Sequence, residues 1–99
     1  MNRFFDELGL RWVAVAKRRS IPIEAPTLDA NVALELLELA RVTAHRQERR
    51  YAPLSCYVAG IAVERLRTSS RGLDDKTVAE MILEVRRQLE IEEPAPSEP

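Results

Sequence analysis

The sequence predicts an all-α protein with the architecture of a small four-helix bundle. Four segments carry apolar residues at the three- and four-residue spacing that places them on one face of a helix. Stretches rich in proline, glycine or serine separate these segments, and no stretch alternates apolar and polar residues as a half-buried strand does. Four amphipathic helices around one core are the simplest way to bury all four apolar faces.

The first predicted helix ends near Arg18, where Lys17 and Arg18 place positive charge beside its carbonyl end. Its expected inward residues lie at helical spacing and are Phe5, Leu8, Trp12, Val15 and Ala16. Pro22 and Pro26 then predict an extended connector, because proline interrupts helical hydrogen bonding and restricts the residue before it.

The second predicted helix is the longest and most apolar, so we expect it to be the central one. Thr27 or Asp29 caps its start by accepting from free backbone N–H groups, and the helix runs to about Arg49. Its expected buried stripe consists of Val32, Leu36, Leu39, Ala40 and Thr43, broadened by Leu37 and Ala44.

The third predicted helix begins at Pro53, because a proline at the first helical position loses no hydrogen bond. Its expected inward residues are Leu54, Tyr57, Val58, Ile61, Ala62 and Leu66. A glycine inside a helix costs ~1 kcal/mol relative to alanine. Gly60 therefore predicts a close crossing with the second helix at Ala40 or Ala44, with no room there for a large side chain.

The fourth predicted helix is capped by Asp74 or Asp75 after a loop of turn-forming residues. Its expected inward residues are Val78, Met81, Ile82, Val85 and Leu89. We expect residues 1–91 to form a single helical domain. Residues 92–99 are expected to be a disordered tail, because they hold mainly proline, glutamate and serine and have little to bury.

Composition excludes several classes of protein. The 15 Lys and Arg nearly balance the 16 Asp and Glu, so the net charge gives no overall electrostatic attraction to nucleic acid or an acidic membrane. No run approaches the ~20 apolar residues of a membrane helix. Cys56 is the only cysteine, which excludes an internal disulfide and a multi-cysteine metal site. We expect a cytoplasmic protein without a metal or cofactor, and a homo-oligomer stays open.

The end of the second predicted helix carries an unusual row of polar residues. Glu38, Arg41, His45 and Arg49 are separated by three, four and four residues, which aligns them along one helix face. The structural interpretation, which we favour, is that His45 hydrogen-bonds a corner carbonyl and Arg49 caps the helix or pairs with a carboxylate. Arg41 then forms a solvated face with Glu38 and Glu48, and cations at a helix C-terminus gain ~0.3–1 kcal/mol in any case.

The alternative interpretation is an anion site at the corner between the second and third helices. Pro53 opens the third helix, and the free N–H groups of Leu54 and Ser55 would attract a phosphate or carboxylate there. Arg49 and the Ser55 hydroxyl would complete the site, with His45 adjusting the charge near neutral pH.

A family resemblance covers the same region. It is carried by Leu36, Leu37, Glu38, Leu39, Ala40, Arg41, Ala44, His45, Arg49, Ala52, Pro53, Leu54, Ser55, Tyr57, Gly60 and Ala62, with Trp12 in the first helix. This pattern resembles a family of small helical domains of unknown function from high-GC bacteria. Members of that family occur alone or attached to proteins similar to molybdenum cofactor guanylyltransferases. The resemblance therefore implies a link to molybdenum cofactor biosynthesis, and it implies no known activity.

Two functional hypotheses follow from the sequence. The first is a non-enzymatic accessory or interaction domain whose partner is a protein of the molybdenum cofactor pathway. The second is a binder of a phosphorylated or nucleotide-like anion at the corner that follows Arg49. Nucleic-acid binding is less favoured, because the apolar residues of the third helix are expected in the core. Catalysis is not expected, because the chain has one histidine and Cys56 has no base predicted beside it.

Overall fold

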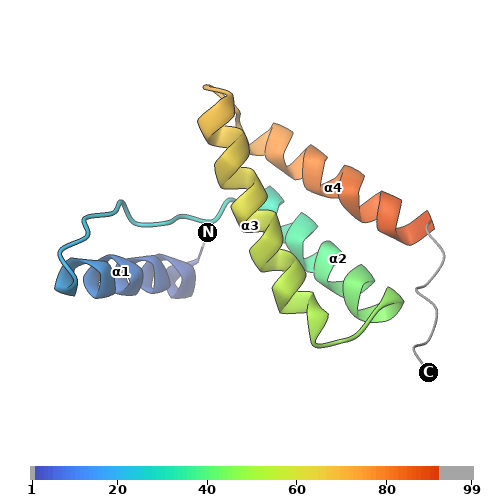
Figure 1. Ribbon diagram of the computed structural model, residues 1–99, viewed down its shortest axis with the longest axis horizontal. Coiled ribbons are helices and arrows are strands. Elements are labelled where there is room, and N and C mark those ends of the chain that lie inside the picture. Colours follow the sequence, from blue (N-terminus) through green and yellow to red (C-terminus); the bar gives the residue numbers. More distant parts are fainter. Residues whose placement is uncertain (1, 92–99) are drawn as a thin grey trace. The chain divides into compact units, whose positions relative to one another are not determined.

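The computed structural model describes residues 2–91, and within them it contains four α-helices and no strand (Figure 1). The helices are α1 (Arg3–Arg18), α2 (Ala30–Arg46), α3 (Tyr51–Ser69) and α4 (Asp75–Ile91). The predicted all-α class with four helices is therefore confirmed. The predicted tail at 92–99 lies outside the described residues. None of the helices in the described part is long and apolar enough to cross a membrane.

The chain divides into two compact units, Met1–Ala30 and Asn31–Pro99. That residues 1–91 form a single domain stays a prediction. In the first unit, the Asn2 side chain caps α1 by accepting from the backbone N–H of Phe5 at 3.2 Å. Leu8 and Trp12 are exposed, so the prediction that they face inward is wrong for this unit.

The first unit holds a close approach between α1 and its connector at Gly9. Gly9 is buried, and a Cβ atom there would lie 2.5 Å from the carbonyl oxygen of Pro26. Real Cβ atoms essentially never come so close to an oxygen. Among the three glycines of the chain, Gly9 is therefore the one that has no room for a side chain.

The second unit is built on α2 and α4, which lie side by side and run in the same direction. α3 runs back from the end of α2 to the start of α4 (Figure 1). Leu39 on α2 and Val78 and Ile82 on α4 form the buried core cluster. Partly buried residues packed against it are Val32, Leu36, Ala59, Val63, Leu73 and Leu89. The predicted stripes of these two helices are thus confirmed at their centres, whereas Leu37 and Val85 are exposed.

Polar contacts fix α4 against α2 at two levels. The Arg86 guanidinium donates to Glu35 on α2 at 3.3 Å and to Glu90 on α4 at 2.6 Å. At the ends of both helices, Arg46 donates to the carbonyl oxygens of Leu89 at 3.3 Å and Glu90 at 2.7 Å. These carbonyls belong to the last turn of α4, where helical donors have run out, so Arg46 caps α4.

The boundaries of the corner differ from the prediction. α2 ends at Arg46 instead of Arg49, and α3 begins at Tyr51, which makes Pro53 its third residue instead of its first. The N–H groups of Tyr51 and Ala52 donate to carbonyl oxygens three residues earlier, at 3.0 and 3.2 Å, and these bonds start the helical turn before the proline. Pro53 still lies in the first turn, where its missing N–H costs little.

The start of α4 agrees with the prediction. The Asp74 carboxylate accepts from the backbone N–H of Thr77 at 2.8 Å, which confirms Asp74 as the cap. The hydrogen bonds from Thr77 hold the pKa of Asp74 below its usual value.

The predictions for α3 are wrong in two respects. None of its residues is buried: Leu54, Tyr57, Val58 and Ile61 are 59%, 72%, 63% and 38% exposed. A Cβ atom at Gly60 would meet nothing within 4 Å, so Ala40 and Ala44 do not lie against it as predicted. The physical reason is that α3 is apolar on most of its circumference, and its contact with the core uses mainly Ala59 and Val63.

Candidate functional site

The predicted polar row on α2 does not form one site. Arg41 pairs with Glu38 at 2.8 Å, as expected, and both side chains are largely exposed, so this pair contributes little to stability. His45 and Arg49 are exposed. The neighbouring Arg46 donates to carbonyl oxygens at the end of α4, whereas the favoured interpretation expected His45 to donate to a carbonyl at the corner.

The corner itself is occupied by a local cluster. The Glu48 carboxylate accepts from the Tyr51 hydroxyl and pairs with Arg50 at 3.2 Å. The hydrogen bond from Tyr51, and then the charge of Arg50, hold the pKa of Glu48 below its usual value, and the same hydrogen bond raises the pKa of Tyr51. Glu48 therefore contacts Arg50 and Tyr51, and not Arg41 as expected for the solvated face.

The backbone donors expected at Leu54 and Ser55 are not free. Because α3 begins at Tyr51, the N–H groups of these two residues fall inside the helical hydrogen-bond ladder. The Ser55 hydroxyl donates to the carbonyl oxygen of Ala52 at 2.7 Å, within the same helix. The N–H groups of Tyr51 and Ala52 donate to the carbonyl oxygens of Glu48 and Arg49, and Pro53 has no N–H, so residues 51–55 offer no free backbone donor to an anion.

A small polar pocket of about 210 Å³ lies between the C-terminal ends of α2 and α4. Its lining brings together Arg41 and His45 with Val42, Arg46 and Glu90. Arg49, Pro53 and Ser55 are not among these residues. Arg46 is held by the carbonyls of α4, and Glu90 adds a negative charge, so an anion would enter this pocket only in competition with existing contacts.

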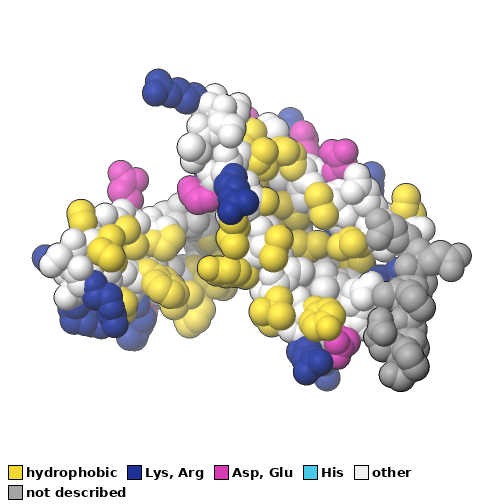
Figure 2. Space-filling model, in the orientation of Figure 1, with side chains coloured by type: hydrophobic (Ala, Val, Ile, Leu, Met, Phe, Trp, Pro, Cys, Tyr) yellow, Lys and Arg dark blue, Asp and Glu magenta, His cyan; other side chains and the backbone are white. Residues whose placement is uncertain are grey.

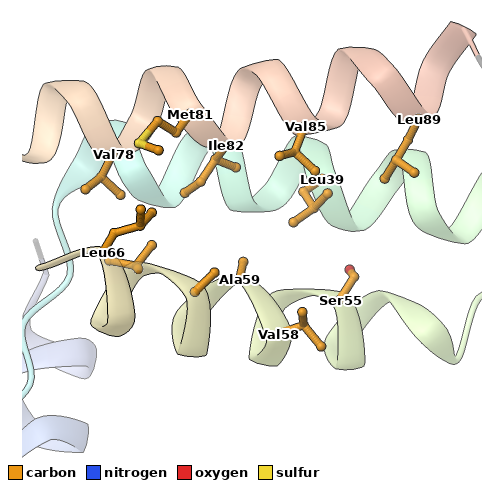
Figure 3. A pocket seen from close by; sticks show the side chains of 12 residues that line it. Leu39, Ser55, Val58, Ala59, Leu66, Val78, Met81, Ile82, Val85 and Leu89 are labelled. Carbon is orange, nitrogen blue, oxygen red and sulfur yellow. The ribbon is translucent and has the colours of Figure 1, made fainter. Parts of the chain in front are cut away.

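An apolar groove of about 470 Å³ lies in the second unit (Figure 3). One wall is α4, the other is α3, and Leu39 of α2 lies at the back. Figure 2 shows hydrophobic side chains gathered along α3 and beside α4. The lining residues are Leu39, Ser55, Val58, Ala59, Ala62, Val63, Leu66, Val78, Met81, Ile82, Val85 and Leu89, and Ser55 is the one polar side chain among them.

The groove exists because small side chains on α3 face larger ones on α4. Ala59 and Ala62 lie opposite a wall that includes Met81, Ile82 and Val85. A closely packed interface would need larger side chains at these alanine positions to reach normal interior density. The sequence pattern identified Ala62, Met81 and Val85 as inward-facing, but it assigned them to a filled core.

One charged residue lies beside the α3 wall of the groove. Arg65 follows Ala62 by three residues on α3 and is exposed, and the structure gives it no ion pair within residues 2–91. On α4, Glu84 lies instead in a separate shallow pocket together with Arg87.

No group of three or more histidine, cysteine, aspartate or glutamate side chains in the described range could hold a metal ion. Cys56 is half-buried, and its thiol lies 3.6 Å from the carbonyl oxygen of Leu36 as a weak donor. This cysteine contributes to the packing of α3 against α2.

Residues 5–96 match the family described as a domain of unknown function, DUF6457. The chain belongs to the DUF6457 family. The expected membership in a small family of unknown function is therefore confirmed, and the family description assigns no activity. No curated protein and no solved structure matches the chain. For this DUF6457 domain, the groove between α3 and α4 is the strongest candidate site, because its lining is apolar apart from Ser55 and it has no occupant within its own unit.

Proposed function

We propose that this DUF6457 domain is a non-enzymatic interaction domain, and that the α3–α4 groove binds an amphipathic helix of a partner protein. The observation that carries the proposal is a groove of about 470 Å³ in which Ser55 is the one polar lining side chain. The hydroxyl of Ser55 already donates to Ala52. A charged metabolite would find no countercharge on these walls, whereas an apolar helix face would be desolvated by them.

The dimensions of the groove suit a helix. Its α4 wall extends from Val78 to Leu89, which corresponds to a length of ~17 Å at the rise of an α-helix. About three turns of a bound helix would fit along it, with two or three large apolar side chains as anchors. Alanines on the α3 wall leave the space that such anchors need.

The charge beside the groove specifies the partner further. Arg65 on the α3 side is exposed and would pair with an acidic residue of the partner. We therefore expect a partner helix with an apolar stripe and acidic residues on the flank that faces α3.

The family resemblance suggests where the partner acts. Members of the resembling family occur attached to proteins similar to molybdenum cofactor guanylyltransferases, so we propose a protein of molybdenum cofactor biosynthesis as the partner. A strain that lacks this chain should then lose molybdoenzyme activity in part or in full. Normal molybdoenzyme activity in the deletion strain would contradict the link to this pathway.

The binding surface is tested by affinity capture from the native organism with matched variants. Val85→Asp places a charge in the groove at a half-exposed position, and we expect it to lose the cofactor-pathway protein that the natural chain retains. Leu37→Asp changes an exposed residue of the same character outside the groove and should retain that protein. Both variants should keep the helical circular dichroism of the natural chain. Equal retention by both would contradict the proposal.

The alternative function is the binding of a phosphorylated or nucleotide-like anion between the C-terminal ends of α2 and α4, instead of at the α2–α3 corner that the sequence indicated. It is favoured by the polar pocket in which Arg41, His45 and Arg46 come together. Titration with pyrophosphate or guanine nucleotides, followed by amide chemical shifts, tests it. Saturable shifts at Arg41 and His45 would support this function, and their absence would exclude it. Nucleic acid is not proposed, because the exposed face of α3 is apolar and phosphates and base edges are read by polar groups.

A further inference from the structure

α3 exposes a second apolar surface, on a face other than the one that lines the groove. Leu54, Tyr57 and Ile61 are separated by three and four residues, are all exposed, and are absent from the groove lining. They therefore form one continuous stripe along the helix. A helix that is apolar on several sides is normally buried, yet none of the residues of α3 is.

Charges of opposite sign stand at the two ends of this stripe. Arg50 precedes Leu54 by four residues, and Glu64 follows Ile61 by three, so both continue the same spacing. Each lies seven residues from Tyr57. Arg50 contacts Glu48 at 3.2 Å in an exposed pair that constrains it little, and Glu64 is exposed.

We propose that this stripe pairs with the same stripe of a second copy of the chain, with the two α3 helices antiparallel about a two-fold axis at Tyr57. In such an arrangement, residues at equal distances before and after Tyr57 face each other. Arg50 of each copy then meets Glu64 of the other, which gives two ion pairs at the ends of an apolar centre.

Gly60 gains an explanation in this arrangement. Leu54 and Gly60 each lie three residues from Tyr57, so Leu54 of the second copy approaches Gly60. A Cβ atom at Gly60 would meet nothing within 4 Å in its own chain, and this open space is what the leucine needs. The close helix crossing that Gly60 indicates is thus one between two copies.

The charge pattern favours a second copy over an unrelated protein. An isologous interface requires that a surface complement itself, and the symmetric placement of Arg50 and Glu64 about Tyr57 meets that requirement. A parallel pairing would set like charges against each other, which is unfavourable. Since one helix pair buries less than a standard interface, we expect a weak, concentration-dependent dimer.

Sedimentation equilibrium of the full chain over a range of concentrations tests the proposal. The natural chain should pass from monomer to dimer. Arg50→Glu and Glu64→Arg should each weaken the dimer by about tenfold or more, because each creates two like-charge contacts. An equimolar mixture of these two variants should form a heterodimer, and a chain that carries both substitutions should dimerise again. Arg71→Glu, a charge reversal at an exposed loop position, should change nothing.

Several results would overturn the proposal. They are a monomer at every concentration, a dimer that withstands Tyr57→Asp, and charge-reversal variants whose mixture associates no better than either alone. A dimer abolished by Val85→Asp instead would place a second copy in the groove. The inference is independent of the proposed function, because Tyr57→Asp should leave capture of the partner protein intact. Circular dichroism of each variant shows whether it remains helical.

Discussion

At the scale of single residues, Arg46 is the side chain that joins the ends of α2 and α4. It donates to the carbonyl oxygens of Leu89 and Glu90, whereas the neighbouring His45 is exposed. We expect Arg46→Ala to lower the free energy of unfolding by about 1 kcal/mol, because two carbonyls lose a charged donor. His45→Ala should change it by no more than about 0.5 kcal/mol. Denaturant melts of both variants check this, and a larger loss in the His45 variant would restore the corner-locking interpretation.

Gly9 and Gly60 should respond in opposite ways to substitution by alanine. Gly9→Ala should destabilise α1 by about 1–3 kcal/mol, because its Cβ would lie 2.5 Å from the backbone oxygen of Pro26. Gly60→Ala should stabilise the monomer by about 0.5–1 kcal/mol, because its Cβ meets nothing and alanine favours the helix. Fluorescence of Trp12, the only tryptophan, reports on α1, and circular dichroism reports on the whole chain. Equal effects of the two substitutions would contradict the contact at Gly9.

At the scale of elements, the start of α4 depends on the Asp74 carboxylate. Its folded-state pKa is lowered from 3.8 by the hydrogen bonds from Thr77, so the cap contributes stability above the unfolded-state pKa. That contribution is lost as the pH falls through the lower folded-state value. Asp74→Ala should therefore lower the Tm near neutral pH by a few degrees and flatten its fall on acidification. Thermal melts across the acidic range test this, and a variant with an unchanged acid profile would contradict it.

Among the helices, the buried faces of α2 and α4 are predictable from the sequence, and that of α3 is not. The spacing of apolar residues places Leu39 on the buried face of α2, and Val78 and Ile82 on the buried face of α4, because only one face of each helix satisfies it. For α3 the pattern fails, because a helix that is apolar on most sides does not reveal which face its own chain covers. The corner was misplaced by two or three residues, since Pro53 is tolerated throughout the first turn.

The candidate site was less predictable than the fold. The pair of Arg41 and Glu38 follows from spacing alone. The cap from Arg46 could not be found in this way, because its acceptors lie 43 and 44 residues away in the sequence. The groove depends on the space that Ala59 and Ala62 leave between α3 and the side chains of α4. This space is set by how the helices pack and not by the spacing of apolar residues in the sequence.

At the scale of the whole molecule, a chain of 99 residues exposes two apolar surfaces in its second unit. One is the α3–α4 groove, and the other is the stripe of Leu54, Tyr57 and Ile61. Small domains bury a limited share of their surface, but contiguous apolar patches of this kind mark sites of association. The two surfaces lie on different faces of α3, so one chain could bind a partner helix and a second copy together.

The central claim, that the groove binds a helix of another protein, is tested most directly by photo-crosslinking in the native organism. A photoreactive residue is placed at Val85 in the groove or, as the control, at the exposed Leu37 outside it. The account predicts an adduct with another protein from position 85 alone, with the crosslink mapped to the apolar stripe of an amphipathic helix. Adducts of equal yield from both positions, or crosslinks from position 85 only to this chain itself, would contradict it.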